Sequence, residues 1–307
     1  MTIPVSTRAL LGRGKTWLRN RTKGGGLKYV GYSSDYAHSI ATEEKNLPNK
    51  ETAGGGYLES KEYITSFTGS MTVNWFNANN LAMAYRGGTI TEDAATVSAE
   101  AHTAYTDSLV LFDHLPDMSA TVTPVIAVSA ARVDSTAYAK GATILVSAVV
   151  YQCTTAGTSD SSAPTFSTAV GTTTTDGTAV WTSRGAVAMV DGVDYQRGKS
   201  GIEILESASR FALGLPITVA YSQAAAEFVQ LLTSSGDEYE LVLDGLNEAD
   251  GGTPFPITLY RVTFSPASNV GWKGDDYAAM PINFKVLIDS SKTGTGVSQY
   301  GKIGLPA

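Results

Sequence analysis

The feature that most restricts the fold of this chain is the alternation of polar and apolar residues over long stretches. Residues 236–264, GDEYELVLDGLNEADGGTPFPITLYRVTF, contain two alternating runs separated by a glycine-rich turn. In the first run one face carries Glu238, Glu240 and Asp244, and the other carries a tyrosine and two leucines. Neighbouring side chains point to opposite faces in a β-strand, so the segment predicts a hairpin with one acidic face and one core face.

A second alternating run, residues 61–76 (KEYITSFTGSMTVNWF), is long for one strand and has Glu62 on its polar face. The following NANNLAMAYRGG carries Asn79 and Asn80 before an Ala- and Leu-rich turn and ends in two glycines, which predicts a short capped helix. Further strand candidates are GIEIL, PITVAYS and PINFKVLID, and we favour a strand for QAAAEFVQLLT. Many strands with one short helix predict a mainly β fold, a β-sandwich or barrel.

The composition changes between residues 126 and 186. This window holds 21 Ser and Thr in 61 residues and few charges, yet its short apolar runs are too frequent for a disordered linker. We therefore predict a small all-β module at 126–186, set into a core domain formed by residues 1–125 and 187–307.

Charge is distributed unevenly. Seven Lys and Arg residues precede the first acid, Asp35, and the rest of the chain carries 15 basic against 29 acidic residues. A body this acidic repels nucleic acid. Two interpretations of the basic segment stay open, an arm lying on an acidic neighbouring subunit and a contact to phosphate. Its candidate contact residues are Arg8, Arg13, Lys15, Arg19 and Arg21.

Residues 41–60, ATEEKNLPNKETAGGGYLES, combine charges, a proline and three consecutive glycines. We interpret this segment as a mobile loop, and a loop of this length in a compact domain usually serves a function, here contact with another subunit. The candidate contact residues are Glu43, Glu44, Lys45, Lys50 and Glu51.

The sequence shows no pattern typical of a catalytic or metal site. Cys153 is the one cysteine, and His38, His102 and His114 are far apart in the sequence. There is no nucleophile elbow, phosphate loop or EF-hand, and carboxylates along an exposed strand face have no environment that would tune them for acid–base or glycosidase chemistry. We expect no enzyme activity, cofactor, metal or membrane span.

The ordered succession of segments resembles the major tail tube proteins of long-tailed bacteriophages (siphophages). Residues 1–125 contribute LLGRGKTWLRN, ATEEKNLPNKET, SFTGSMTVNWF and NNLAMAYRGG, and residues 187–307 contribute VDGVDYQRGKSGIEIL, GLPITVAYS, YELVLDGLNEADG, PITLYRVTFSPA and INFKVLIDSSK. Within the module, VVYQCTTAGTSDSSAPTF and TTTTDGTAVWTSRG are similar to Ig-like or carbohydrate-binding-like modules of phage virion proteins.

The resemblance implies a structural virion protein of the phage tail, assembled in the bacterial host cytoplasm. Its subunits would form hexameric rings that stack into a tube, with the loop and the basic arm as contacts between rings. Other partners implied are the tape-measure, tail terminator and distal tail proteins. DNA would pass during ejection without specific binding, along an acidic wall whose candidate residues are Glu62, Glu238, Glu240 and Asp244.

The module would then face outward, since it would block a lumen. Its aromatic residues Tyr151, Phe166 and Trp181 either form its core or stack on sugars of the host surface, and we favour the core. The alternative function is an adhesin or baseplate protein that binds host polysaccharide through this module.

Overall fold

The computed structural model describes residues 9–51 and 53–306. The chain divides into two compact units, and each is described by itself. Unit 1 comprises Met1–Ile90 and Glu227–Ala307, and unit 2 comprises Thr91–Ala226. The division therefore falls well outside the 126–186 window that the composition marks, and most of the surrounding strands belong to the same unit as the module. The prediction of a mainly β fold with one short helix is confirmed.

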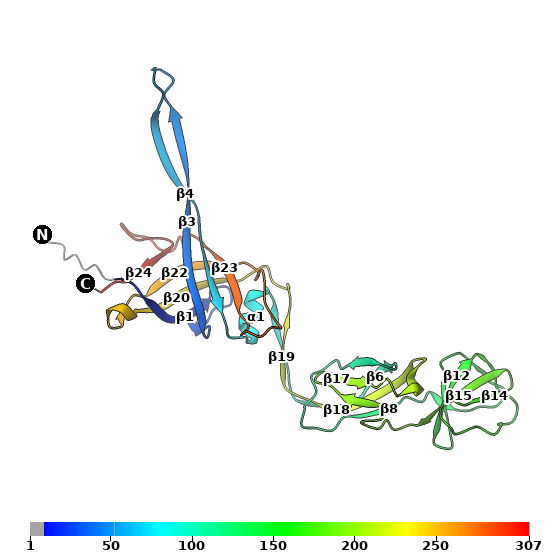
Figure 1. The fold of residues 1–307 in the computed structure, drawn as a ribbon. Coiled ribbons are helices and arrows are strands. Elements are labelled where there is room, and N and C mark those ends of the chain that lie inside the picture. Colours follow the sequence, from blue (N-terminus) through cyan, green and yellow to red (C-terminus); the bar gives the residue numbers. More distant parts are fainter. Residues whose placement is uncertain (1–8, 52, 307) are drawn as a thin grey trace. The chain divides into compact units, whose positions relative to one another are not determined.

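Unit 1 is built on one large antiparallel sheet, whose strands differ in length and follow the order β2-β1-β20-β22-β23-β4-β3 (Figure 1). Two short strands add to this path, β21 on β20 and β24 on β22. The strands are β1 (Gly12–Asn20), β2 (Lys28–Tyr29), β3 (Ser33–Pro48), β4 (Tyr57–Val73), β20 (Glu238–Asn247), β21 (Thr253–Pro254), β22 (Ile257–Phe264), β23 (Met280–Val286) and β24 (Gly301–Ile303). A 3-10 turn, η2 (Glu248–Asp250), follows β20.

This sheet curls toward closure without forming a barrel. Its outer strands β2 and β3 are joined by three residues, and Thr16 Oγ1 of β1 lies 3.2 Å from Ser33 Oγ of β3. The core lies on the concave side, where Met71, Leu241 and Phe284 are buried. Every second residue of these strands enters that core, which explains the alternation of polar and apolar residues in the sequence.

The segment predicted as a mobile loop is strand for most of its length, so that prediction is wrong. β3 and β4 pair in register from Ser33–Val73 to Pro48–Tyr57, and the loop shrinks to residues 49–56. Gly54, Gly55 and Gly56 all have positive φ there. β4 pairs with β23 only over residues 68–73, so the outer part of the hairpin has no third strand. Both of its faces meet solvent, and the apolar alternation that reveals a strand in sequence is therefore weak.

The helix α1 (Ala78–Ala84) forms where the sequence predicted it, but its cap is Asn77, whose side chain accepts from the Asn80 N–H. Asn79 and Asn80 lie inside the helix. Asn80 is buried, and its amide donates to the Val30 carbonyl at 2.7 Å and the Trp75 carbonyl at 2.9 Å. This side chain fixes the helix against the segment that joins β2 to β3.

The chain leaves unit 1 through β5 (Gly88–Glu92) and returns through β19 (Ala226–Gln230), and these two strands pair with each other. The strand favoured for QAAAEFVQLLT is therefore confirmed over residues 226–230. Unit 2 thus begins and ends on neighbouring strands, which is the geometry of an inserted domain.

Unit 2 contains a sandwich of two three-stranded sheets, ordered β6-β18-β8 and β16-β17-β7. The strands are β6 (Ala95–Ala104), β7 (Ser108–Leu111), β8 (Thr123–Ile126), β16 (Tyr195–Arg197), β17 (Gly201–Ile204) and β18 (Leu215–Gln223), and the 3-10 turn is η1 (Ser209–Phe211). Ile126, Ile202 and Ile217 from both sheets pack into one core with Phe211.

The module predicted at 126–186 forms a five-stranded sheet of its own within unit 2, ordered β14-β15-β12-β11-β9, and a two-stranded sheet, β10-β13. These strands are β9 (Ala130–Ala131), β10 (Ala137–Tyr138), β11 (Thr143–Val146), β12 (Val149–Thr155), β13 (Gly157–Thr158), β14 (Thr173–Asp176) and β15 (Ala179–Ala186). Its small core is separate, but Ile126 and Val150 belong to the core of the sandwich.

Two buried arginines join the module to the sandwich. Arg184 donates to Gln152 Oε1 at 2.9 and 3.1 Å, and the Gln152 amide donates to the Gly214 carbonyl at 2.7 Å. Arg210 donates to the carbonyls of Arg184, Ala186 and Ala188, and its Nε lies 3.1 Å from Asp194 Oδ1. Burial lowers the pKa of both arginines. The module is therefore packed onto the rest of unit 2 rather than tethered to it.

Replacing Arg210 with Met should destabilise unit 2 by about 3–5 kcal/mol, because the change leaves a buried carboxylate without its cation. Urea unfolding measures this when it is followed by the fluorescence of Trp181, the one tryptophan in unit 2, in a background where Trp17, Trp75 and Trp272 of unit 1 are replaced by Phe. Arg210→Lys keeps the charge but not the fork of donors and should fall between wild type and Arg210→Met. Wild-type stability in Arg210→Met would contradict the assigned role.

Candidate assembly surfaces

The convex face of the unit 1 sheet is mostly polar. We call it the polar face, and it consists of the side chains that alternate with the core residues. Its members on the central strands are Lys15, Trp17, Arg19, Glu238, Glu240, Val242, Asp244, Thr258, Tyr260, Thr263, Pro281, Asn283, Lys285, Thr68, Ser70 and Thr72. The register brings them together from both ends of the chain.

Acidic residues of the polar face are held in ion pairs. Glu238 accepts from Arg261 at 2.5 and 2.8 Å, and Glu240 pairs with Arg19. Arg21 donates to Asp289 at 2.6 Å and also to the Tyr260 carbonyl. The hydrogen bonds from Arg261 lower the pKa of Glu238, and those from Arg21 and Ser291 lower the pKa of Asp289. Glu238 and Asp289 therefore stay ionised, and cations of the same chain offset the charge of all three acids.

The four acids predicted for a lumen do not lie together. Glu238, Glu240 and Asp244 share β20, where Asp244 is exposed and lies opposite Lys15. Glu62 lies on the outer part of the β3–β4 hairpin. Unit 1 as a whole carries 16 Lys and Arg against 16 Asp and Glu, whereas unit 2 carries six against 13. The acidic excess of the chain therefore belongs to unit 2, and the face that holds three of the candidates is mixed in charge.

The basic segment at the N-terminus is largely not an arm, which corrects that prediction. Residues 12–20 form β1, and every one of them pairs with β20. Arg13 binds Glu248 at 2.7 Å, and Arg19 and Arg21 bind the acids described above. The Lys15 ammonium lies over the Tyr29 ring. Arg8 lies outside the described residues. These cations bind their own chain, so the predicted bridge to a neighbour loses most of its free charge.

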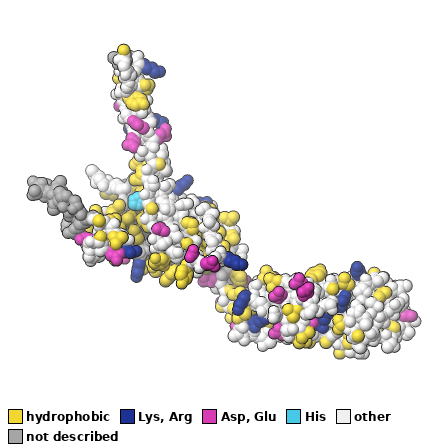
Figure 2. Space-filling view, viewed as in Figure 1, with side chains coloured by type: hydrophobic (Ala, Val, Ile, Leu, Met, Phe, Trp, Pro, Cys, Tyr) yellow, Lys and Arg dark blue, Asp and Glu magenta, His cyan; other side chains and the backbone are white. Residues whose placement is uncertain are grey.

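The candidate contact residues of the hairpin remain exposed. Glu43, Glu44 and Lys45 lie on β3, and Lys50 and Glu51 lie in the turn. Figure 1 shows the hairpin extending beyond the rest of the unit 1 sheet. Figure 2 shows apolar, acidic and basic side chains along its length. Of the predicted contact residues within the described part of the chain, this set is the one that the fold leaves available.

The aromatic residues of the module form its core. Tyr151 and Trp181 are 1% and 0% exposed, and Phe166 packs against Tyr151 with ring centroids 4.7 Å apart. Tyr138 completes the cluster by an edge contact with Trp181. The interpretation as core is confirmed, and stacking of Tyr151 or Trp181 on sugars is excluded because neither ring reaches the surface.

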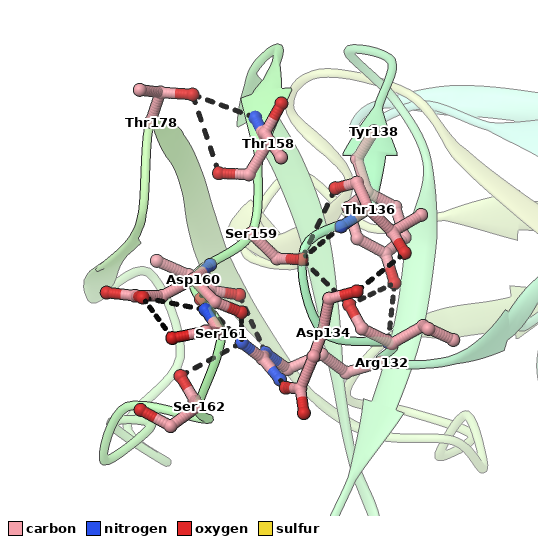
Figure 3. A network of polar contacts seen from close by, with 12 residues as sticks. Arg132, Asp134, Thr136, Tyr138, Thr158, Ser159, Asp160, Ser161, Ser162 and Thr178 are labelled. Atoms are coloured by element: carbon pink, nitrogen blue, oxygen red, sulfur yellow. Dashed lines mark hydrogen bonds and ion pairs between the residues drawn. The ribbon is translucent and has the colours of Figure 1, made fainter.

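A polar network replaces the apolar bulk that this Thr-rich module lacks (Figure 3). Arg132 donates to both oxygens of Asp176 at 2.8 Å, to the carbonyls of Asp160 and Ser162, and to Asp134. Hydrogen bonds with Asp176 raise the pKa of Arg132 and lower that of Asp176. The network holds the turn-rich segment after β13. The sequence feature that could have indicated this network is that the few charged residues of the 126–186 window include Arg132 and three aspartates.

Sequence analysis missed a buried carboxylate in the sandwich of unit 2. Glu100 accepts from Tyr221 Oη and from the Asp113 N–H at 2.8 Å, and it lies 2.5 Å from His102 Nε2. Burial opposes its charge, but these hydrogen bonds lower its pKa. The Phe112 ring stacks on both Tyr221 and His102 beside this carboxylate. All oxygen atoms are engaged within the fold, so the group stabilises the sandwich and offers no open position for a substrate.

Among residues 9–51 and 53–306, no group of three or more His, Cys, Asp or Glu side chains is placed to hold a metal ion. The described helices include none with the length and apolar content needed to cross a membrane. The organised polar features of the molecule are thus surfaces and internal networks.

These observations define a mainly β chain with an incompletely closed sheet in unit 1 and an inserted β unit. The chain belongs to the family described as protein of unknown function UCP028589, whose sequence model matches residues 9–148 and 154–304. The match runs through both units, so the inserted unit is included in it. No curated protein matches the chain.

Acid should weaken unit 1 through the polar-face ion pairs. The pKa values of Glu238 and Asp289 are lower in the folded state, so their stabilisation is present above the unfolded carboxylate pKa of about 4 and is lost as the pH falls through the folded values. Urea midpoints at pH 7 and pH 3 measure the loss. An Arg21→Met, Arg261→Met variant should be less stable at pH 7 and show a smaller drop. An equal drop would contradict this assignment.

Proposed function

We propose that this protein is a structural subunit of a phage tail tube, in which unit 1 assembles into stacked rings and unit 2 is carried on them. The observation that carries the proposal is the unsatisfied edge of the unit 1 sheet. β3 (Ser33–Pro48) is the last strand of the sheet, and along the described residues it pairs with β4 alone. A strand edge of this length invites pairing with another chain unless it is covered.

The incomplete closure of unit 1 supports the same proposal. The sheet curls, and among the described residues a side-chain contact between Thr16 of β1 and Ser33 of β3 joins its two sides, but beyond this contact β3 continues into the hairpin. Joining such edges between copies related by rotation would complete the hydrogen bonds of β3 and generate a closed ring. The resemblance to tail tube proteins supplies the ring and the stacked tube as the specific form of assembly.

The charge distribution also fits a conduit. Unit 1 has equal numbers of acidic and basic residues, so it exerts little long-range attraction on a phosphate backbone. DNA could then move along a wall of unit 1 subunits without binding tightly. The adhesin alternative loses two of its three candidate contact residues, because Tyr151 and Trp181 are buried.

The first test is negative-stain electron microscopy of the purified full chain at high concentration, with and without an initiating tail complex. Stacked rings with a central channel are expected. Uniform single particles under both conditions, from protein whose circular dichroism shows a folded β structure, would contradict the proposal.

Unit 2 should be dispensable for assembly. Replacing Thr91–Ala226 by a short Gly-Ser turn joins the paired strands β5 and β19 and should leave rings and tubes intact with less external mass. Removing only residues 126–186 should instead destabilise what remains of unit 2, because it deletes Ile126 and Val150 from the sandwich core. Microscopy and thermal unfolding of both deletions check this. Loss of assembly in a folded deletion of unit 2 would place ring contacts there.

A further inference from the structure

The outer part of the β3–β4 hairpin is a two-stranded ribbon whose two faces differ in charge. We call it the ribbon, residues 42–48 and 57–64, where β3 and β4 pair only with each other. Alternation divides its side chains between two faces. One, the glutamate face, carries Thr42, Glu44, Asn46, Ser60, Glu62 and Ile64. The other, the lysine face, carries Glu43, Lys45, Leu47, Glu59, Lys61 and Tyr63.

Like charges stand directly opposite each other on both faces. Glu44 pairs with Glu62 across the ribbon, and Lys45 pairs with Lys61 one position further on. Directly opposed like charges destabilise an antiparallel pair, whereas opposite charges would stabilise it. None of these four residues forms an ion pair with any described residue. The arrangement therefore weakens the isolated ribbon, and no ion pair with a described residue offsets it.

Local contacts hold each charge pair on its own face. The ammonium groups of Lys45 and Lys61 lie 5.9 and 5.4 Å from the centre of the Tyr63 ring, which gathers both cations on the lysine face. On the reverse side, Ser60 Oγ donates to Glu44. Each face thus presents a compact pair of one sign beside an aromatic or hydroxyl group.

The ribbon also exposes apolar side chains on both of its faces. Ile64 is 59% exposed on the glutamate face, and Leu47 and Tyr63 are 55% and 44% exposed on the lysine face. Exposed apolar groups concentrated on one projecting element mark an interaction site. These apolar side chains lie beside the charged pairs and can exclude water from them when a partner binds.

We infer that the glutamate face of one copy docks onto the lysine face of a second copy, with Glu44 and Glu62 against Lys45 and Lys61. Both faces belong to every copy, so the contact is heterologous and repeats head to tail. The inference deepens the proposed function, on which it rests for the kind of assembly formed, by naming the surfaces that meet.

The charges flanking the lysine pair fix the register of this contact. Glu43 and Glu59 lie on either side of Lys45 and Lys61 on the lysine face, so that face has no net charge. A glutamate face displaced by two residues along the ribbon would meet Glu43 or Glu59 instead of a lysine. Juxtaposed like charges disfavour such alternatives, so the pattern selects one alignment and adds little non-specific attraction.

Two double variants test the inference. The lysine-face variant is Lys45→Glu with Lys61→Glu, and the glutamate-face variant is Glu44→Lys with Glu62→Lys. Each keeps like charges opposite each other within the chain, so the cross-strand repulsion in the free subunit is unchanged in kind. We expect each variant alone to need a protein concentration at least about 10-fold higher than wild type for self-association, measured by sedimentation velocity at low salt.

Mixing the two variants in equal amounts should restore association, because each then offers the charge that the other lacks. The quadruple variant, with both pairs exchanged, should associate by itself. Asp275→Lys with Asp276→Lys reverses two exposed charges outside the ribbon and serves as the matched control, which should behave as wild type. Circular dichroism and thermal unfolding confirm that each variant is folded.

The outcomes separate this inference from the tube proposal. Wild-type association by each double variant alone, no restoration on mixing, or a wild-type chain that does not self-associate would overturn the inference. Tubes formed equally well by every variant would retain the tube proposal and remove the ribbon contact. Restored pairwise association in the mixture without rings or tubes would retain the ribbon contact and remove the tube proposal.

Discussion

The pairing of β1 with β20 is the contact on which unit 1 depends. It joins the first described strand to one that follows unit 2 in the sequence, and every residue of β1 takes part. Leu18 and Leu241 enter the core from this pair, and Thr16 is fully buried beside them. The concave core, the curl of the sheet and the polar face all require that the two ends of the chain meet here.

An intervening unit makes that meeting costly in chain entropy unless its own ends are close. The cost of closing a loop rises slowly with its length and falls when the loop is itself folded. Unit 2 begins within β5 and ends at the first residue of β19, and these strands pair. Once unit 2 is folded, the two segments of unit 1 are held side by side, and the large insertion behaves as a short connection.

The same long-range pairing explains why the charge asymmetry of the sequence disappears in the fold. In the sequence, the cations gather near the N-terminus and the acids follow later, which suggests a basic arm on an acidic domain. In unit 1 they become neighbours, as Arg13 with Glu248, Arg19 with Glu240 and Lys23 with Asp237. The charges of the ribbon differ from these, because Glu44, Glu62, Lys45 and Lys61 form no ion pair with a described residue and lie on a projecting element.

The sequence by itself determined the mainly β fold, the helix after β4, the strand at 226–230 and the aromatic core of the module, because burial of one face leaves a periodic apolar signal. It marked residues 61–64 as strand but did not reveal residues 42–48 as their partner, since a two-stranded element with both faces in solvent carries little of this signal. Nor could it reveal the limits of unit 2, since pairing of β5 with β19 joins residues distant in sequence. Only the tertiary structure decided which charges of the chain bind one another and which remain free, because that depends on strand order and register, and these arise from contacts across the whole chain.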